Sequence, residues 1–323
     1  MLLAGDVGGT KTLLGLFEGD GARPAPVVIE EFATGDHAGL EPLLRVFLAR
    51  HLEGSTPVSS AAFGVAGPVI DQVAALTNGT WVVDGRSIGS GLGVRRVTVL
   101  NDLEAMAHAV PVLEARELHV LQAGQPRPSG NAALLAAGTG LGEAVLIRVG
   151  RELVPSPTEG GHADWAARTP REIDVLRTLS AEFGRVDVEH VVSGPGLVNL
   201  SRVTHRGGGS CAAAAAAGSG DAAAISASAR TRACARCVEA LDLFVAAYGA
   251  EAGNLALRSM ATSGVYVGGG IAPKILWALE PGGFIEAFRA KAPMDTLMSS
   301  IPVSVILNRQ VGLLGAAVAA ARG

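Results

Sequence analysis

Short runs of apolar residues alternate along the chain with polar and glycine-rich segments. Each run is bounded by Gly, Asp, Asn or Pro, which is typical of strands that end in turns. The runs that predict strands are Leu2–Gly5, Thr12–Glu18, Val27–Phe32, Ala61–Val65, Val97–Leu100, Ala132–Ala136, Glu143–Val149, Val265–Gly268 and Val303–Leu307.

Longer segments with a helical spacing of apolar residues separate these strands. They predict helices at Glu41–Leu52, Leu103–Val110, Pro170–Phe183, Gly196–Thr204, Ala222–Met260 (broken) and Val311–Arg322. The letters TPRE at Thr169–Glu172 form a capping box with Pro at the first helical position, which is a strong helix start. Strands in tandem followed by strand–helix alternation indicate a layered α/β fold.

Composition excludes several classes of protein. The chain has 323 residues, of which 49% are hydrophobic and 17% charged, so it is not disordered. A net charge of −4 leaves no basic face for nucleic acid. Asp6 and Lys11 interrupt the first apolar stretch, and no uncharged run suits a membrane span. We therefore expect a soluble cytoplasmic protein.

The three cysteines, Cys211, Cys234 and Cys237, are too few for a disulfide framework. Cys234 and Cys237 lie in a helical pattern, where a zinc or redox role would need further Cys or His at ligand spacing. We interpret them as small buried hydrophobic residues. The Gly- and Ala-rich segment 207–224 predicts a flexible surface loop that runs into a helix, with a functional lid as the alternative.

Three glycine-rich turns follow predicted strands: DVGGTKT (6–12), AAGTGLG (136–142) and VGGGIAP (267–273). The first has neither P-loop nor dinucleotide-binding spacing, and it predicts strand, tight turn, strand. Glycines permit positive φ and let backbone N–H groups face an anion. A plain turn is the commoner explanation for each alone. Because the three turns occur together, in two similar halves of the chain, they indicate a nucleotide site. Two hairpins would hold a triphosphate, and the third turn would lie against the base and ribose.

Polar residues follow several of the predicted strands. Asn101 and Asp102 come at the end of Val97–Leu100, where α/β sheets bind ligands, although either residue could simply cap the next helix. Glu159 and His162 flank two glycines, which allow a tight bend. Their side chains could both point at one polar ligand, or they could lie on a surface turn. Such side chains, with Asn78 and Glu189, suit a ligand with many hydroxyl groups.

In this order the motifs resemble those of bacterial glucokinases, a sugar-kinase branch of the actin/Hsp70/hexokinase superfamily. The resemblance covers nearly the whole chain and rests on DVGGTKT, GVAGPV (64–69), TNGTW (77–81), LNDLEAMA (100–107), AAGTGLG, EGGHADW (159–165), SGPGLVNL (193–200) and GVYVGGGIAP (264–273). It implies a two-domain actin/hexokinase-like (ribonuclease H-like) α/β fold with the active site in the cleft between the domains. We expect a small domain from residues 1–110 plus 309–323 and a large one from residues 111–308.

The resemblance also implies residue roles. Asp102 would be the catalytic base that accepts the proton of the sugar 6-hydroxyl, and Asp6 would lie near Mg²⁺, through water. The sugar-binding residues would be Asn101, Glu159, His162 and Glu189, with Asn78. The nucleotide-binding residues would be Asp6, Gly8, Gly9, Thr10, Lys11, Thr12, Gly138, Thr139, Gly140, Gly268, Gly269 and Gly270, of which the last three would contact adenosine.

The implied activity is the ATP-dependent phosphorylation of D-glucose to glucose 6-phosphate by a homodimer, with no nucleic acid or membrane partner. Two alternatives remain open. One is a kinase of another hexose or amino sugar from the repressor–ORF–kinase (ROK) family, and ADP or polyphosphate could replace ATP as donor. The other is a non-catalytic sugar sensor, which would need a helix-turn-helix domain before the hairpin that begins at Leu2. ROK proteins usually carry a Cys-rich zinc cluster soon after EGGH. Here no Cys follows His162 until Cys211, so we expect no structural zinc.

Overall fold

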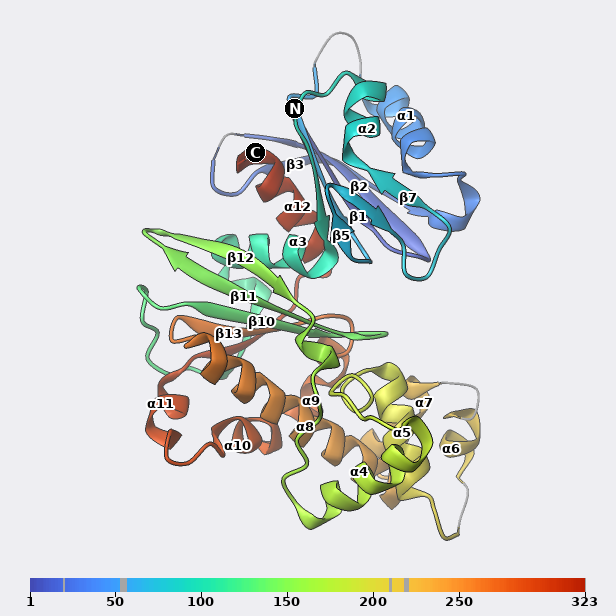
Figure 1. Cartoon of the computed structure of the whole chain (residues 1–323), viewed down its shortest axis with the longest axis vertical. Coiled ribbons are helices and arrows are strands. Elements are labelled where there is room, and N and C mark those ends of the chain that lie inside the picture. Colours follow the sequence, from blue (N-terminus) through green and yellow to red (C-terminus); the bar gives the residue numbers. More distant parts are fainter. Residues whose placement is uncertain (20, 53–56, 209–210, 218–220, 323) are drawn as a thin grey trace. The chain divides into compact units, whose positions relative to one another are not determined.

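The computed structural model describes residues 1–19, 21–52, 57–208, 211–217 and 221–322 (Figure 1). They form two compact units. The first comprises Met1–Ala115, Val154–Pro157 and Asn308–Gly323, and the second comprises Arg116–Leu153 and Thr158–Leu307. The predicted domain boundaries, and the cleft expected between the domains, stay predictions.

The first unit is built on a five-stranded sheet with the order β3-β2-β1-β4-β8. Its strands are β1 (Leu2–Val7), β2 (Lys11–Glu18), β3 (Ala25–Ala33), β4 (Ser60–Val65) and β8 (Val97–Asn101). The strands β1, β4 and β8 are parallel, so their carboxyl ends meet at one edge of the sheet. A small sheet, β5-β6-β7, consists of β5 (Val69–Ile70), β6 (Val73–Ala75) and β7 (Val82–Asp84).

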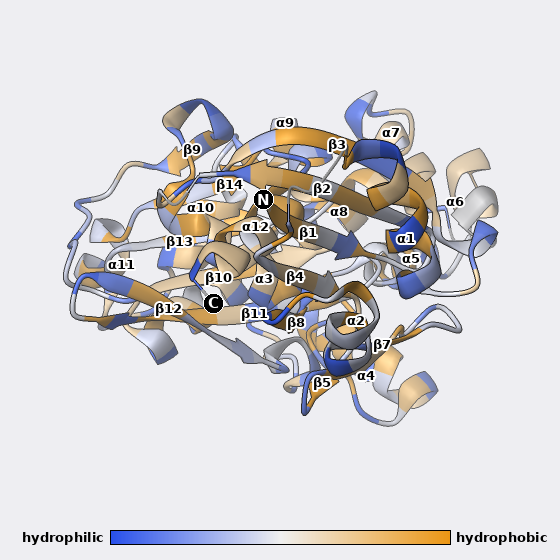
Figure 2. Cartoon of the chain, turned by 90° about the horizontal axis from the view of Figure 1, so that it is seen from above, coloured by the Kyte–Doolittle hydropathy of each residue, from blue (hydrophilic) through white to orange (hydrophobic). Residues whose placement is uncertain are grey.

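Helices pack on this sheet. They are α1 (Leu40–His51), α2 (Gly85–Leu92), α3 (Asp102–Ala109) and α12 (Val311–Arg322), with short 3-10 turns at Thr34–Asp36 and Val110–Val112. The C-terminal helix α12 packs against β1, β4 and α3, as predicted. A Cβ atom on Gly315 would lie 1.6 Å from the carbonyl oxygen of Ala105, so glycine allows α12 and α3 to touch. Strand β2 is hydrophobic along its middle and polar at its ends (Figure 2).

The second unit is built on a six-stranded sheet with the order β12-β11-β10-β13-β14-β9. Its strands are β9 (Leu118–Gln122), β10 (Ala132–Ala137), β11 (Leu141–Val149), β12 (Glu152–Thr158), β13 (Gly264–Gly268) and β14 (Val303–Ile306). The middle of β12, Val154–Pro157, is nevertheless grouped with the first unit. As in the first sheet, a hairpin (β10–β11) stands beside parallel strands (β13 and β14). The order of the first sheet is thus repeated, with β9 added at one edge.

The helices of the second unit are α4 (Pro170–Phe183), α5 (Gly194–Thr204), α6 (Ala212–Ala217), α7 (Ala222–Arg230), α8 (Ala235–Ser259), α9 (Leu276–Leu279), α10 (Gly283–Arg289) and α11 (Asp295–Ser300), with 3-10 turns at Ala115–Glu117, Gly160–His162 and Ala272–Ile275. The long helix α8 packs against α5, α7, α10 and β10 and forms the centre of the core. Within the described part of the chain, no helix combines the length and apolar character that a membrane span requires.

The predicted strands and helices are confirmed, with ends that agree closely. The capping box at α4 is present, since the Thr169 side chain accepts from the Glu172 N–H and the Glu172 carboxylate accepts in return. The predicted break in Ala222–Met260 falls between α7 and α8.

Two interpretations need correction. The loop predicted at 207–224 contains the helix α6, because a run of Ala has the highest helix propensity; residues 209–210 and 218–220 lie outside the described part. Cys237 is buried as predicted, but Cys234 is only half-buried. The assumption that no further Cys or His stands at ligand spacing is also wrong, because His205 and Cys211 lie beside this pair.

Candidate active site

The first glycine-rich turn joins β1 to β2 at the carboxyl edge of the first sheet. The Gly8 N–H donates to the Lys11 carbonyl at 3.0 Å and closes the turn. A Cβ atom on Gly9 would lie 2.2 Å from the backbone oxygen of Asn78, so no side chain fits there. The exposed loop residue Asn78 is thereby brought against the turn.

Thr12 and Lys11 support this turn in different ways. Thr12 is fully buried, and its hydroxyl hydrogen-bonds that of Thr34 at 2.9 Å, while Thr34 donates to the Gly8 carbonyl at 2.7 Å. The side chain of Thr12 therefore holds the turn. Lys11 pairs with Glu31 at 3.0 Å, but both side chains are exposed, so the pair contributes at most about 1 kcal/mol.

Two carboxylates stand beside the first turn. Burial and, to a smaller extent, the negative charge of Asp102 raise the pKa of Asp6 to about 6, against an opposing effect of Lys11. A Cβ atom on Gly312 would lie 2.8 Å from Asp6 Oδ2, so the start of α12 comes close to this carboxylate. Asp6 and Asp102 thus concentrate negative charge at one place, and carboxylate oxygens are the ligands that Mg²⁺ prefers.

Asn101 and Asp102 lie where β8 ends and α3 begins. Asn101 is the N-cap, since its Oδ1 accepts from the Leu103 N–H at 2.9 Å, and its Nδ2 donates to the Gly67 carbonyl at 3.2 Å. Asp102 occupies the first helical position, and its Oδ1 also accepts from the Leu103 N–H at 2.9 Å. The cap expected from Asn101 or Asp102 is therefore present, because both side chains accept from the Leu103 N–H, and the helix dipole favours a negative charge on Asp102.

The second glycine-rich turn joins β10 to β11 in the second unit. The Gly138 N–H donates to the Gly140 carbonyl at 2.8 Å, and the Gly194 N–H at the start of α5 donates to the Gly138 carbonyl at 2.8 Å. Glu189 fixes the other side, because its Oε2 accepts from the Leu141 N–H at 2.8 Å. A Cβ atom on Gly140 would come within 2.5 Å of this oxygen, so Glu189 needs glycine there.

The third glycine-rich turn, Gly268–Gly270, packs on the second. Gly269 has a φ of +82°, and its Cβ atom would lie 2.4 Å from the Ala137 carbonyl oxygen. The buried Tyr248 hydroxyl accepts from the Ala137 N–H at 3.2 Å and donates to the Gly268 carbonyl at 3.4 Å. The two turns therefore form one block, from which Thr139 and Gly270 are exposed.

The EGGH segment forms a bend packed on β11. A Cβ atom on Gly161 would lie 2.0 Å from the Leu141 carbonyl oxygen, and the Gly161 carbonyl accepts from the Glu189 N–H at 2.9 Å. These contacts bring Glu159, His162 and Glu189 together beside the second turn. Glu159 is exposed, and the His162 side chain is 52% exposed, so both are open to a ligand.

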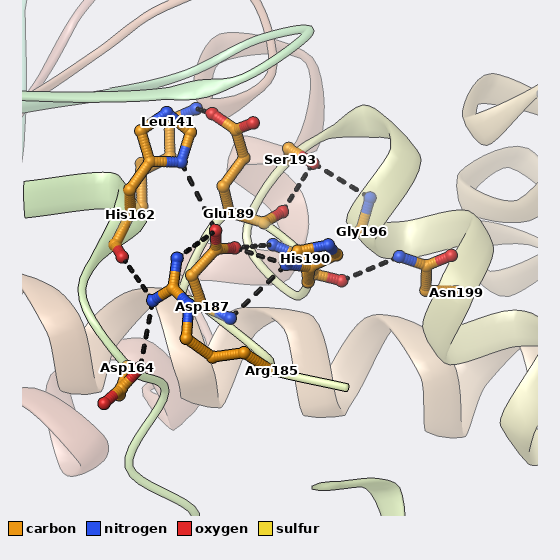
Figure 3. A network of polar contacts seen from close by, with 10 residues as sticks. All are labelled: Leu141, His162, Asp164, Arg185, Asp187, Glu189, His190, Ser193, Gly196 and Asn199. Carbon is orange, nitrogen blue, oxygen red and sulfur yellow. Dashed lines mark hydrogen bonds and ion pairs between the residues drawn. The ribbon is translucent and has the colours of Figure 1, made fainter. Parts of the chain in front are cut away.

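A buried carboxylate that the sequence analysis missed orients His162 (Figure 3). Asp187 Oδ2 lies 3.3 Å from His162 Nδ1, and Asp187 Oδ1 accepts from the His190 N–H at 2.9 Å. Burial raises the pKa of Asp187, but the hydrogen bonds from His190 and His162 outweigh it and hold that pKa below its usual value. A carboxylate can only accept, so His162 carries its proton on Nδ1 and presents Nε2 as an acceptor.

Glu143 is the second residue that the sequence analysis missed. It lies on β11, is 1% exposed, and its Oε1 has no hydrogen-bond partner within the described ranges. A Cβ atom on Gly160 would come within 2.1 Å of its Oε2. Burial and the charge of Glu251 raise the pKa of Glu143 to about 8, against a smaller opposing effect of Arg258. Glu143 is therefore protonated at neutral pH. The signal was a lone acidic residue in an apolar strand.

Each unit thus gathers its own set of predicted residues. In the first unit, Asp6, Asn78, Asn101 and Asp102 surround the first turn. In the second unit, Glu159, His162 and Glu189 surround the second turn, which carries the third on its other side.

Known proteins match this arrangement over their whole length. The family model described as Glucokinase matches residues 3–323. A glucokinase of Nostoc punctiforme is 37% identical, over 100% of this chain and 99% of its own. The crystal structure of a glucokinase from an Antarctic psychrotroph superposes with a TM-score of 0.88 at 29% identity, over 100% and 99% of the two chains. A ROK family glucokinase from Streptomyces griseus, in complex with glucose and AMPPNP, has a TM-score of 0.66 at 20% identity, over 100% and 99%.

Proposed function

Because this chain belongs to the glucokinase family, and is therefore an ATP-dependent sugar kinase that phosphorylates glucose, we propose that Asp102 accepts the proton of the attacking sugar hydroxyl. One observation carries the proposal. Asp102 stands at the carboxyl end of β8, next to the first glycine-rich turn, while the neighbouring Asn101 caps the helix. Transfer of a phosphoryl group asks mainly for positioning and charge stabilisation, and a carboxylate here orients the hydroxyl and takes its proton as it attacks.

The second unit holds the sugar in this proposal. His162 presents Nε2 as an acceptor because Asp187 fixes its other nitrogen, and Glu159 stands on the same bend. Glu189 accepts from the Leu141 N–H with one oxygen, which leaves further acceptor sites for a hydroxyl group. Carboxylates and an unprotonated ring nitrogen accept strongly, and sugar hydroxyls donate to them. Asn101 and Asn78 supply amide groups from the first unit.

The Gly8 and Gly138 N–H groups close the first two turns, and the other backbone N–H groups of these turns hold the phosphates of ATP. Gly268–Gly270 lies against its adenosine. Gly9 and Gly140 are packed so tightly that side chains are excluded, which fixes the backbone of both turns. Lys11 stands exposed at the end of the first turn and offsets phosphate charge.

The residues present also fit Mg²⁺, which the family resemblance implies. The charge of Asp102 makes the pKa of Asp6 higher, so a cation near both carboxylates would relieve their repulsion. Asp6 would hold the ion through water, and Mg²⁺ characteristically keeps several waters. When bound, the ion offsets negative charge on the transferring phosphates.

The alternatives raised by the sequence differ in their support. The family match and the higher TM-score of the psychrotroph glucokinase favour glucokinase over a ROK kinase of another sugar. The same match favours an enzyme over a sugar sensor. We further propose, from the family resemblance alone, a homodimer that acts in the cytoplasm; light scattering of the purified chain tests the dimer.

The variant Asp102→Asn tests the proposed base. We expect turnover to fall by about 10²–10⁴, because the amide keeps the size of the side chain but cannot accept the proton. Stability should hardly change, since Asn suits a helix N-terminus as well as Asp does.

Asp84→Asn is the matched control. Asp84 also lies where a strand, β7, meets a helix, α2, which it caps through the Arg86 and Ser87 N–H groups. Its exchange should leave turnover unchanged. A stable Asp102→Asn enzyme with the turnover of the control would remove Asp102 from the mechanism.

A further inference from the structure

Four side chains that can bind a metal converge in the second unit, on the helical layer that holds α5 and α8. His205 follows α5, Cys211 precedes α6, and Cys234 and Cys237 lie at the start of α8. Their ligand atoms all lie within 4.8 Å of one another. Cys211 Sγ is 3.5 Å and Cys234 Sγ 3.4 Å from His205 Nε2, and Cys211 Sγ is 3.6 Å from Cys237 Sγ.

Three of the six separations among these atoms lie close to the edges of a tetrahedral zinc site, and the other three are at most 4.8 Å. With Zn–S bonds of about 2.3 Å and Zn–N bonds of about 2.0–2.1 Å, tetrahedral geometry places ligand atoms about 3.5–3.8 Å apart. Two thiols that merely pack together have no need of an imidazole nitrogen at the same distance. Three sulfurs and one nitrogen at these spacings therefore outline a closed four-ligand site.

The orientation of His205 is a second, independent sign of a metal. Its Nδ1 lies 2.7 Å from the carbonyl oxygen of Ser201, which can only accept. Nδ1 therefore carries the proton, and the unprotonated Nε2 faces the three sulfurs. A ligating histidine characteristically donates its other N–H to a carbonyl or carboxylate in this way, which fixes both tautomer and ring orientation.

The sulfurs are placed as thiolates in a metal site are. Cys234 and Cys237 have the Cys-x-x-Cys spacing of zinc knuckles and belong to the first turn of α8, whose positive end favours negative sulfur. Cys211 Sγ accepts from the Ala214 N–H at 3.3 Å. Within the described ranges none of the three cysteines forms a disulfide.

We propose that His205, Cys211, Cys234 and Cys237 bind one structural Zn²⁺. All four positions are filled by protein ligands, so the ion has no open position for catalysis. The site differs from the zinc cluster whose absence after EGGH led us to expect no zinc, because its ligands come from farther along the chain. Its test is independent of the sugar kinase proposal.

The zinc would tie Cys211, which directly precedes α6, to the core. Ordering glycines costs more conformational entropy than ordering other residues, and few apolar side chains in the glycine- and alanine-rich sequence around Cys211 can offset that cost. Binding of a structural zinc supplies folding free energy directly. The site thus accounts for how the start of α6 is held beside α5 and α8.

Metal analysis of the full chain tests the proposal. The protein is expressed without a tag in zinc-supplemented medium and purified with a reductant and without chelator. Plasma mass spectrometry should find one zinc per chain. After exchange into Co²⁺, the protein should show sulfur-to-cobalt charge transfer and the intense visible bands of a tetrahedral ion.

Variants locate the site. Cys211→Ser and Cys234→Ser should lose the zinc, whereas His119→Gln should retain it, because His119 pairs with Glu280 at the surface and lies outside the cluster. If the cysteine variants do not fold, the cobalt spectrum of the unaltered chain still tests the zinc site. A metal-free chain without a tetrahedral thiolate spectrum, a disulfide among the three cysteines, or full zinc content in Cys234→Ser would each overturn the proposal.

Discussion

The two glycine-rich hairpins, β1–β2 and β10–β11, occupy matching places in sheets of the same strand order, yet their turns differ. The last paired residues are Val7 and Thr12 in the first hairpin but Ala137 and Leu141 in the second, so the first turn holds one more residue. Each hairpin stands beside a parallel strand, β4 or β13. The same backbone frame is thus used twice with different turns.

Their acidic residues differ as well. Asp6 directly precedes the last paired residue of β1, whereas Ala136 has that place in β10. Conversely, Glu143 on β11 matches Leu14 on β2, which is fully buried. The first hairpin therefore places a carboxylate at the turn, and the second buries a protonated one beneath the EGGH bend. The sheet positions both turns, but single residues beside them, Asp6 and Glu143, decide which turn carries a carboxylate at its end.

The largest expected effect comes from Glu143→Gln. The pKa of Glu143 is raised in the folded state, so this group supports folding at low pH and its contribution is lost as pH rises from about 4.5 to about 8. The loss amounts to about 1.4 kcal/mol for each pH unit. Gln cannot ionise, so the variant should become the more stable protein as pH increases.

Urea unfolding from pH 4.5 to 9 measures this difference. The control is Glu152→Gln, an exposed residue on β12 that should leave the pH profile unchanged. Parallel profiles for Glu143→Gln and the unaltered chain would contradict a buried, protonated Glu143.

Asp6→Asn sharpens the comparison at the first turn. If Asp6 holds Mg²⁺ through water, its exchange should raise the Mg²⁺ concentration for half-maximal rate about 10–100-fold, the usual effect of losing an outer ligand. Titration of the rate with Mg²⁺ at saturating glucose measures it. Glu18→Gln, at the exposed far end of β2, is the control. An unchanged dependence of the rate on Mg²⁺ concentration would show that Asp6 does not help to bind the ion.

Alanine at one glycine of each turn probes how tightly that turn is packed. In Gly9→Ala the new methyl group would meet the Asn78 backbone, and overpacking of this kind costs about 1–3 kcal/mol. In Gly138→Ala nothing lies within 4 Å of the Cβ position, so the unfolding free energy should change by less than about 0.5 kcal/mol. Urea unfolding measures both variants, and an equal loss of unfolding free energy in the two would show that the turns are not packed as described.

The smallest effect is expected for His162→Ala. The variant loses one acceptor for a sugar hydroxyl at a half-exposed site, which should weaken glucose binding by about 0.5–1.5 kcal/mol. Binding of an ATP analogue should not change. Calorimetric titration measures both, with His119→Gln as the control. Equal weakening of both ligands would argue against a sugar-binding role.

Most of the fold could be predicted because its strands are continuous apolar runs with clear ends. Elements without such runs were missed. Strand β12 contains two prolines, which confine it to the edge of its sheet, and helix α2 contains three glycines and is begun by Asp84. The helix α6 was taken for a loop, because its alanines stand between glycine-rich segments.

The candidate site was predictable where a motif follows a strand, as at Asp102 or Gly138–Gly140. Asp187 and Glu143 were not found, because neither is part of a recognisable motif and their importance comes from burial beside His162 and Gly160. Likewise, His205 and Cys211 are separated along the chain from Cys234 and Cys237, and only the packing of α5 against α8 brings them together.

The division of labour between the two units is tested most directly by the affinity of Asp102→Asn for glucose. The account assigns the proton to Asp102 in the first unit and most of the hold on the sugar to His162, Glu159 and Glu189 in the second. Calorimetric titration should therefore give a glucose dissociation constant within about tenfold of that of the unaltered enzyme, because at most one hydrogen bond to the sugar is lost. Turnover should nevertheless fall by about 10²–10⁴. A variant whose glucose affinity falls as far as its turnover would contradict the account.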